Sequence, residues 1–245
     1  MLAGCGRIGF GAASDAAAVA TEVLVAAGPF TMGCRVPNEA DCRTIEDPVH
    51  VVTLSAFSID QTEVTQLAYA RCVTSGACTH PATDFDPDLT PDHPVRQVTW
   101  SQADAYCAFD GKRLPTEAEW EKAARGDDGR TYPWGEAAPT CDLAIFDLCA
   151  GAEPLPVGSR PSGRSPYGAF DMAGNVWEWT QDWFDPTYYT TSPTNDPQGP
   201  PNGTSRSVRG GYYGNTPRNV RTAGRASEDP MVPEAYLGFR CARSP

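Results

Sequence analysis

The sequence predicts one α+β domain with little regular secondary structure. Glycine and proline each occur 23 times in 245 residues, which indicates many turns and irregular connections and argues against a helical bundle. Short stretches with strand-like alternation are followed by short stretches with helical spacing and capping residues. The chain has no internal repeat, and no linker divides its body. We therefore expect residues 1–21 to be a flexible tether and residues 22–245 to form a single compact domain.

The first expected elements are strands. Residues 22–33, EVLVAAGPFTMG, alternate apolar residues and end in a glycine turn, which is typical of a strand or a hairpin. Residues 50–60, HVVTLSAFSID, alternate in the same way, so that Val52 and Leu54 share one face and Val51 lies on the other.

Three short helices are expected next, each between a hydroxyl side chain that caps its start and a glycine that ends it. These segments run from Thr65 to Gly76, from Ser101 to Gly111 and from Thr116 to Gly126. The last is the clearest, because Glu119 follows Thr116 by three positions and completes a capping box.

The rest of the chain is expected to be mostly irregular. Residues 127–166 are rich in turn residues, residues 171–183 crowd three tryptophans together, and residues 186–205 read as a loop of Thr, Pro and Asn. Two strands are expected at the end of the chain, in SVRGGYY (207–213) and YLGFRCAR (236–243).

The charge is acidic but uneven. The net charge of −12 repels phosphate backbones, so we expect no nucleic-acid partner. Residues 206–243 hold seven arginines against three acidic residues, a local balance of +4. Two explanations are open: the arginines pair with carboxylates elsewhere in the fold, which we favour, or they line a cleft for an anionic or peptide ligand. The sequence contains no run of 18 apolar residues, so it predicts no transmembrane helix.

The N-terminal residues resemble a lipoprotein processing site. Leu2-Ala3-Gly4-Cys5 has the form of a bacterial lipobox, in which the cysteine receives the lipid, and a Gly- and Ala-rich stretch follows it. A signal peptide needs a charged head and an apolar stretch before cleavage, and only four residues precede Cys5. Either the start of the chain is missing or the match is a coincidence.

The cysteine count favours disulfides. Apart from Cys5, eight cysteines remain, and six of them form close pairs in the sequence: Cys34 with Cys42, Cys72 with Cys78, and Cys141 with Cys149. None of these pairs has the short spacing of a zinc knuckle. An even number of cysteines is typical of an oxidising compartment, which supports export and a lipid on Cys5. Eight cysteines allow 105 pairings, so the count alone leaves the bonding scheme open.

Five motifs in order carry a family resemblance. They are GKRLPTEAEWEKAARG (111–126), YPWG (132–135), YGAFDMAGNVWEWTQDW (167–183), RGG (209–211) and LGFRC (237–241). With them the sequence resembles the formylglycine-generating enzyme family, the sulfatase-modifying factor domain, over about residues 23–243. The resemblance implies a single compact domain related to C-type lectins, with bound calcium.

The resemblance also implies an active site that this chain lacks. The family's oxidase converts a substrate cysteine to formylglycine with molecular oxygen and copper, and two cysteines shortly after the Gly-Gly pair suit Cu(I). Here the segment from Tyr212 to Arg218 holds no cysteine, and Tyr212 replaces the family's serine. The histidines precede residue 94, and His50 and His93 fall in motifs that look structural. We therefore expect no catalytic residues and neither copper nor iron.

The same template suggests a disulfide scheme. One family disulfide joins the positions of Cys107 and Cys241, and a second would join Ala124 to Thr222, where both cysteines are absent together. The three close pairs then take the remaining six cysteines, and Cys5 is left for the lipid.

The template places calcium at Asp171, the carbonyls of Gly174 and Val176, and Glu178. The alternative is that Asp171 caps a turn and Glu178 pairs with an arginine. A second family calcium site would fall near Ala144, where Asp142 or Asp147 would have to substitute for missing ligands.

These expectations lead to a non-oxidase function. We expect an exported, calcium-stabilised lipoprotein of the bacterial envelope that binds an unidentified protein or peptide ligand or serves as a scaffold, with Cys5 as its contact to the membrane. The alternative is an oxidoreductase of the wider family, which generates formylglycine on sulfatases or uses non-heme iron. The expected ligand cleft consists of Tyr212, Tyr213, Arg218, Arg225, Trp134 and Trp183.

Overall fold

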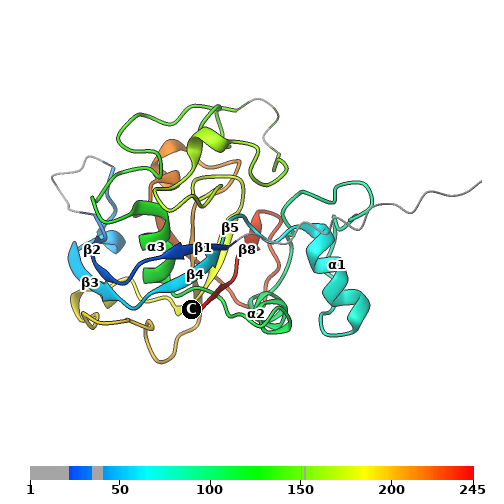
Figure 1. Cartoon of the computed structure of the whole chain (residues 1–245), viewed down its shortest axis with the longest axis horizontal. Helices are drawn as coiled ribbons and strands as arrows, with labels where there is room; N and C mark the ends of the chain where they lie inside the picture. Colours follow the sequence, from blue (N-terminus) through cyan, green and yellow to red (C-terminus); the bar gives the residue numbers. More distant parts are fainter. Residues whose placement is uncertain (1–21, 35–40, 150, 152) are drawn as a thin grey trace, which may run out of the picture.

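The computed structural model describes residues 22–34, 41–149, 151 and 153–245 (Figure 1). The expected tether and Cys5 therefore lie outside the described residues. Within them, short strands, three α-helices and long irregular connections form the mixed α+β architecture that the sequence predicted.

The two N-terminal alternating stretches pair with each other. β1 (Glu22–Val25) is antiparallel to β4 (Phe57–Asp60), and β2 (Gly28–Met32) is antiparallel to β3 (His50–Leu54). The register is continuous from Glu22 opposite Asp60 to Met32 opposite His50. Neither stretch therefore folds back on itself as a hairpin. The alternation holds, because Val52 and Leu54 are buried and Val51 is exposed.

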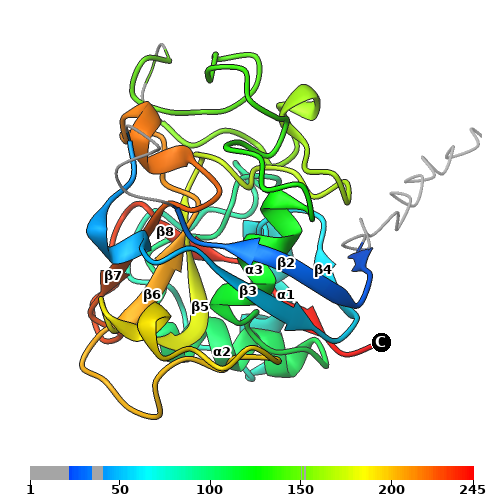
Figure 2. The same cartoon turned by 90° about the vertical axis from the view of Figure 1, so that its left-hand side faces the viewer.

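A separate four-stranded sheet contains the tryptophan-rich segment. Its strand order is β7 (Arg225–Glu228), β6 (Arg206–Arg209), β5 (Trp177–Trp183) and β8 (Leu237–Phe239), with β5 and β8 parallel (Figure 2). β9 (Ala242–Arg243) pairs with β4, so that β1, β4 and β9 form a three-stranded sheet and β2 and β3 a separate two-stranded one. The chain end, which supplies β8 and β9, ties the three-stranded sheet to the four-stranded one. β5 and β7 were not predicted as strands.

The helices begin at threonines. α1 (Gln66–Ser75) is capped by Thr65, and α3 (Glu117–Arg125) is capped by Thr116 with Glu119 completing the box, as predicted. The prediction for α2 (Trp100–Phe109) was wrong at its start, because Thr99 and not Ser101 is the N-cap. Thr99 is the cap because its hydroxyl accepts the N–H of Gln102, and the Gln102 side chain accepts the N–H of Thr99.

α3 is the centre of the fold. It contacts β2, β3, β5 and β6, and each of its nine residues is buried. Figure 2 shows it behind β2 and β3, on their side toward β5 and β6. The turn-rich segment 127–166 and the 3-10 helix η4 (Pro217–Val220) lie together at the opposite end from α2 (Figures 1 and 2).

Four disulfides brace the described chain, and they are the pairs that cysteine spacing and the family resemblance suggested. They are Cys34–Cys42, Cys72–Cys78, Cys107–Cys241 and Cys141–Cys149. The third links α2 to the segment between β8 and β9 across 134 positions. Within the described ranges, no helix has the length and apolar character needed to cross a bilayer.

Candidate functional site

The C-terminal arginines enter the core and pair with carboxylates of α3. Both Arg225 and Arg209 have no measurable exposure. Arg225 donates from Nε and Nη2 to the two carboxylate oxygens of Glu117 at 2.7 and 2.8 Å. Arg209 forms an ion pair with Glu121. The favoured explanation of the positive C-terminal segment holds for five of its seven arginines, while Arg206 and Arg218 form no ion pair among the described residues. Arg225, which was predicted to line a cleft, is instead buried in the core.

A third buried arginine, Arg240, pairs with Glu178, which was predicted to bind calcium. Arg240 donates from Nη2 to Oε1 of Glu178 at 2.7 Å and from Nε to Oε2 at 2.6 Å. The indole of Trp120 donates to the same Oε2 at 2.8 Å. Both oxygens of Glu178 therefore already accept hydrogen bonds, and the arginine pairing that the sequence left as an alternative is present.

Next to this pair lie two carboxylates without an arginine of their own. Glu63 is buried between β4 and α1; its Oε1 accepts from the side chain of Asn175 at 3.1 Å, and its Oε2 has no hydrogen-bond partner among the described residues. Asp171 is also buried, and its Oδ2 accepts the N–H of Gly158 at 2.6 Å. Asp171 has a φ of 57°, a left-handed conformation that Asp tolerates better than most residues.

The electrostatics of this group favour a cation. Burial, and after it repulsion by Asp171 and Glu178, holds the pKa of Glu63 well above its usual value. Burial also raises the pKa of Asp171; the Gly158 N–H, Arg240 and Glu63 oppose this rise, and the charge of Glu178 adds to it. Three carboxylates face the single positive charge of Arg240, so the group carries two surplus negative charges when all are ionised. An orphaned carboxylate oxygen beside surplus charge is what a hard, oxygen-seeking ion such as Ca²⁺ requires.

The region thus combines an orphaned carboxylate oxygen with buried negative charge, two features that a calcium site would use. Of the predicted calcium ligands, Glu178 has both oxygens engaged by Arg240 and Trp120, whereas Glu63, which was not predicted, has an oxygen without a partner among the described residues. Sequence reasoning missed Glu63 because it precedes the DMAGNVWE motif by more than a hundred positions. At the expected second calcium site, Ala144 is buried while Asp142 and Asp147 are exposed, and no cluster forms there among the described residues.

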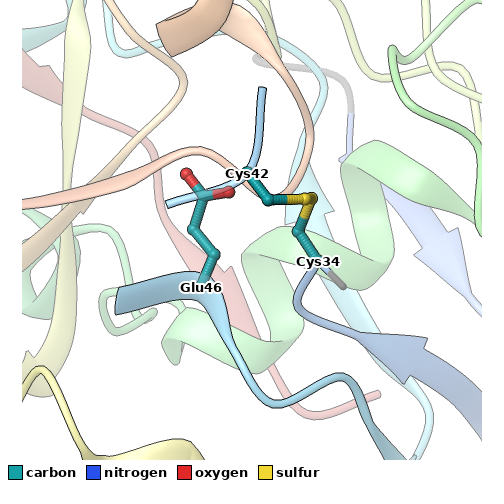
Figure 3. A group of neighbouring side chains, drawn as sticks. All are labelled: Cys34, Cys42 and Glu46. Carbon is teal, nitrogen blue, oxygen red and sulfur yellow. A yellow bond between two sulfur atoms is a disulfide. The ribbon is translucent and has the colours of Figure 1, made fainter. Parts of the chain in front are cut away.

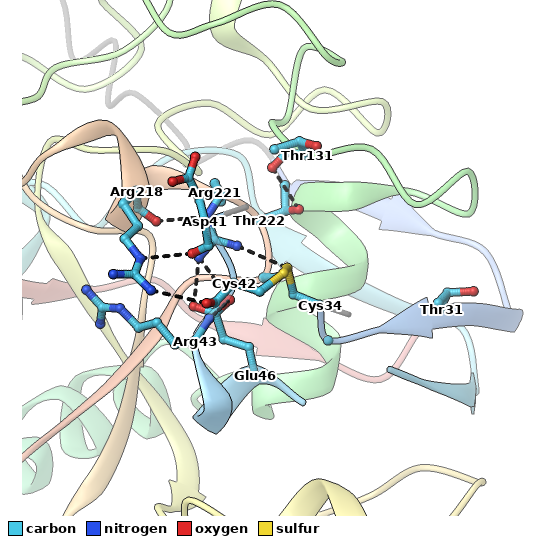
Figure 4. Close-up of a disulfide and its surroundings, with 12 residues drawn as sticks. Thr31, Cys34, Asp41, Cys42, Arg43, Glu46, Thr131, Arg218, Arg221 and Thr222 are labelled. Carbon is cyan, nitrogen blue, oxygen red and sulfur yellow. Dashed lines mark hydrogen bonds and ion pairs between the residues drawn. A yellow bond between two sulfur atoms is a disulfide. The ribbon is translucent and has the colours of Figure 1, made fainter. Parts of the chain in front are cut away.

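The segment that replaces the family's copper-binding cysteines is a closed turn. The N–H of Asn215 donates to the carbonyl of Tyr212 at 2.8 Å, and the Asn215 side chain accepts the N–H of Tyr212 at 3.2 Å. Arg218 reaches away from this turn and donates to the backbone carbonyls of Asp41 and Cys42 at 2.9 and 3.1 Å (Figure 4). Arg218 thus fastens the Cys34–Cys42 loop rather than facing an open cleft.

One group has the spacing of metal ligands but not their chemistry. Atoms of Cys34, Cys42 and Glu46 lie within 4.8 Å of one another, a spacing that no other group of metal-ligand side chains reaches in the described part of the chain (Figure 3). The two sulfurs are bonded to each other. Nη2 of Arg221 donates to Oε1 and Oε2 of Glu46 at 2.8 and 2.9 Å. A thiolate must be free to bind a metal, so this group is a structural brace.

Ala124 and Thr222, the positions of the absent second family disulfide, are both fully buried. Thr222 compensates with polar contacts: its Oγ1 accepts from Nε of Arg125 at 3.1 Å and donates to the carbonyl of Arg130 at 2.9 Å. The hydrogen bonds hold the segments that a disulfide would otherwise join.

The aromatic residues predicted for the cleft lie in different places. Trp134 stacks on Tyr132 with centroids 5.2 Å apart, and Tyr212 packs against Tyr236 with centroids 4.7 Å apart. Tyr213 touches Tyr212 edge-on. Trp183 instead lines a separate pocket of about 460 Å³. The structure therefore does not gather the six predicted residues into one cleft.

Comparison with known proteins is consistent across sequence and structure. Residues 10–245 match the sulfatase-modifying factor enzyme 1-like domain. The chain is 37% identical to the formylglycine-generating enzyme of Streptomyces coelicolor, over 90% of this chain and 88% of that protein. It is 34% identical to the hercynine oxygenase of Mycolicibacterium smegmatis, over 91% of this chain and 61% of that protein. The structure of PvdO from Pseudomonas aeruginosa superposes with a TM-score of 0.78 at 25% identity, over 91% and 94% of the two chains.

Proposed function

The chain belongs to the sulfatase-modifying factor enzyme 1-like domain family, and from this premise we propose that it is a non-oxidase member with a calcium-stabilised binding or scaffold role. The observation that carries the proposal is that the turn from Tyr212 to Arg218 contains no cysteine. The resemblance to the family's oxidase predicts two cysteines in this segment. Tyrosine, asparagine and threonine offer hard oxygen donors, which are poor ligands for Cu(I). Arg218 supports the same conclusion, since it is committed to holding a neighbouring loop.

The test is an aldehyde assay. Purified disulfide-bonded protein is incubated with copper, oxygen and a cysteine-containing sulfatase peptide, and the peptide mass is followed. The formylglycine-generating enzyme of Streptomyces coelicolor serves as the positive control. We expect no conversion of the peptide cysteine by this chain. Copper-dependent aldehyde formation would refute the proposal.

The second candidate is an oxidoreductase of the wider family. Its support is the 37% identity to a formylglycine-generating enzyme over nearly the whole length of both proteins. As far as formylglycine generation is concerned, the aldehyde assay decides between the non-oxidase and the oxidoreductase. For the non-heme iron type, iron that remains bound through purification and supports turnover would favour the oxidoreductase.

We assign a structural role to calcium in this proposal. Glu63, Asp171 and the carbonyls of Gly174 and Val176 would hold the ion, which would neutralise the surplus buried charge. Calcium is therefore expected to raise the melting temperature of metal-free protein more than magnesium does, because Mg²⁺ demands a stricter octahedral geometry.

A matched pair of variants tests the calcium ligands. Glu63→Gln removes one of the surplus charges, so we expect weaker calcium binding and a smaller calcium-dependent stabilisation. Glu46→Gln alters another buried carboxylate, one that pairs with Arg221, and should lower stability equally with and without calcium. An unchanged calcium response in Glu63→Gln would remove Glu63 from the site.

Export and a lipid on Cys5 belong to the same proposal. Four disulfides are expected to persist in an oxidising compartment, which supports an extracytoplasmic location. Intact mass of protein from its native host tests both points. Reduction should add eight hydrogens, two for each of four disulfides, and the N-terminal peptide should carry a lipid mass; a smaller gain on reduction or an unmodified Cys5 would contradict them.

A further inference from the structure

Arg206 is clamped between two indole rings. It begins β6 opposite Trp183, the last residue of β5. Its guanidinium carbon lies 3.6 Å from the ring centroid of Trp183 and 3.8 Å from that of Trp100, which begins α2. Trp100 is itself fixed, because its Nε1 donates to the carbonyl of Thr180 at 2.8 Å. The two rings therefore hold the plane of the guanidinium in a set orientation.

The positive charge of Arg206 has no counter-ion in the described part of the chain, whereas Arg209, Arg221, Arg225 and Arg240 all have one. Arg206 donates from Nη1 to a backbone carbonyl of β5, and its buried Nε has no acceptor among the described residues.

The nearest carboxylates do not compensate this charge. Asp182 of β5 points into the interior, where its Oδ2 accepts the N–H of Glu117. Asp104 of α2 attracts the charge of Arg206 electrostatically, without a hydrogen bond or an ion pair. Burial lowers the pKa of Arg206, and these two acids oppose the shift without forming an ion pair. An arginine that is oriented, partly buried and unpaired is ready for an external anion.

Arg206 lines the pocket of about 460 Å³, a size typical of sites for small organic ligands. The walls are rings and neutral amides rather than further charges. They include Trp100, Trp183, Pro200, Pro201, Gln181 and Gln198. The prolines come from the loop between β5 and β6.

We propose that this pocket binds an organic carboxylate, whose apolar body packs on the indole and proline rings while its carboxylate pairs with Arg206. A single planar guanidinium matches a planar monoanion in charge and shape, and the glutamine amides can bind a neighbouring polar group. Phosphate and sulfate carry more charge and usually require several donors, which the lining does not offer. The carboxylate can belong to the C-terminus of a peptide or to a free small molecule, since both present the same chemistry.

The pocket is separate from the region of the family's active site. Arg206 is the first residue of β6, and the Gly210–Gly211 pair follows the end of that strand. Four residues of extended chain separate the two by about 13 Å. Carboxylate binding at Arg206 is therefore independent of both the oxidase question and the calcium site, and its failure would leave the proposed function standing.

Binding is tested with matched acids and amides on the full disulfide-bonded chain. The probes are 3-phenylpropionate with its amide, and the peptide Ala-Pro-Phe with a free or an amidated C-terminus. Tryptophan fluorescence or calorimetry follows the titration. We expect the acids to bind at least about tenfold more tightly than the amides, a difference of about 1.4 kcal/mol. A tighter peptide acid would indicate a peptide terminus as the source, and a tighter phenylpropionate would indicate a free carboxylate.

Two variants of Arg206 test its role. Arg206→Met keeps much of the side-chain volume and should abolish the preference for acids; Arg206→Lys keeps the charge without the planar fork and should weaken acid binding several-fold. Arg130→Met, which alters an arginine paired with Asp128 at the surface, should bind like the native chain. Thermal melts establish that each variant folds. Equal binding of acids and amides, no binding of either acid, stronger binding of inorganic phosphate, or native affinity in Arg206→Lys would overturn the proposal.

Discussion

Asp182 lies within β5 and is 3% exposed, and its Oδ2 accepts the N–H of Glu117 at 2.7 Å. Glu117 and Glu119 of α3 face it as negative charges, while Arg225 of β7 opposes them. Burial first, and then repulsion by Glu117, raises the pKa of Asp182 to about 8. The folded protein thus retains a proton on this side chain at pH values where the unfolded chain has already released it.

This retained proton predicts a pH-dependent stability. Because the folded pKa of Asp182 is raised, its contribution to the free energy of unfolding is complete below about pH 4 and is lost as the pH rises toward 8. The slope from this one group is about −1.4 kcal/mol per pH unit between pH 5 and 7. Asp182→Asn keeps an acceptor for the Glu117 N–H and should remove that slope. Urea unfolding at several pH values measures it, with the exposed Asp128→Asn as control; parallel curves for Asp182→Asn and native protein would exclude this assignment.

At the scale of single elements, α3 shows how local sequence and tertiary packing agree. Thr116 accepts the N–H of Glu119 at 3.1 Å, and Glu119 accepts the N–H of Thr116 at 2.8 Å. Glu119 also pairs with both terminal nitrogens of Arg113 at 2.6 Å. The same helix supplies Glu117 and Glu121 to the buried arginines, so the position of its first turn sets the geometry of the core ion pairs.

Loss of the cap should therefore cost more in α3 than in α1. Thr116→Ala removes a buried N-cap hydroxyl that accepts the N–H of Glu119, within a capping box whose other bond runs from the Thr116 N–H to the Glu119 carboxylate, so we expect a loss of about 1–2 kcal/mol in the free energy of unfolding. Thr65→Ala is the matched variant: its cap accepts the N–H of Ala68 at 3.2 Å without a reciprocal bond, and the expected loss is about 0.5–1 kcal/mol. Urea unfolding compares them, and an equal or larger loss for Thr65→Ala would speak against the coupling of the cap to the core.

The elements that the sequence predicted are those whose signals are local. Caps and glycine stops mark α1 and α3, and alternation marks β3. β5 escaped prediction even though its tryptophans alternate with polar residues in WEWTQDW; Glu178, Thr180 and Asp182 are buried too, so the strand has no solvent-exposed polar face. The site is harder, because Glu63 and Asp171, or Trp100, Trp183 and Arg206, meet only through the tertiary fold. The sequence predicted Asp171 and Trp183 as site residues, but only the structure showed which residues lie beside them.

At the scale of the whole molecule, irregular segments are held by crosslinks. The Cys107–Cys241 disulfide spans 134 positions and joins α2 to the end of the chain, which in turn adds β9 to β4. Arg240, the residue before Cys241, donates to the carbonyls of Asp60 and Phe170 as well as to Glu178. One short stretch near the C-terminus thus connects the three-stranded and four-stranded sheets, α2 and the candidate calcium region.

The disulfides should therefore differ in what they contribute to stability. In the loop-entropy account, a crosslink stabilises by restricting the unfolded chain, and the effect grows with the logarithm of loop length. The Cys107→Ala/Cys241→Ala double variant should lose about 5 kcal/mol, and the matched Cys72→Ala/Cys78→Ala variant, whose loop spans 6 positions, should lose about 2.4 kcal/mol. Both pairs are buried, so the cost of replacing sulfur by alanine is comparable in the two variants. Guanidinium unfolding of the oxidised proteins measures the difference, and equal losses would show that local native contacts, rather than restriction of the unfolded chain, determine what these bonds contribute.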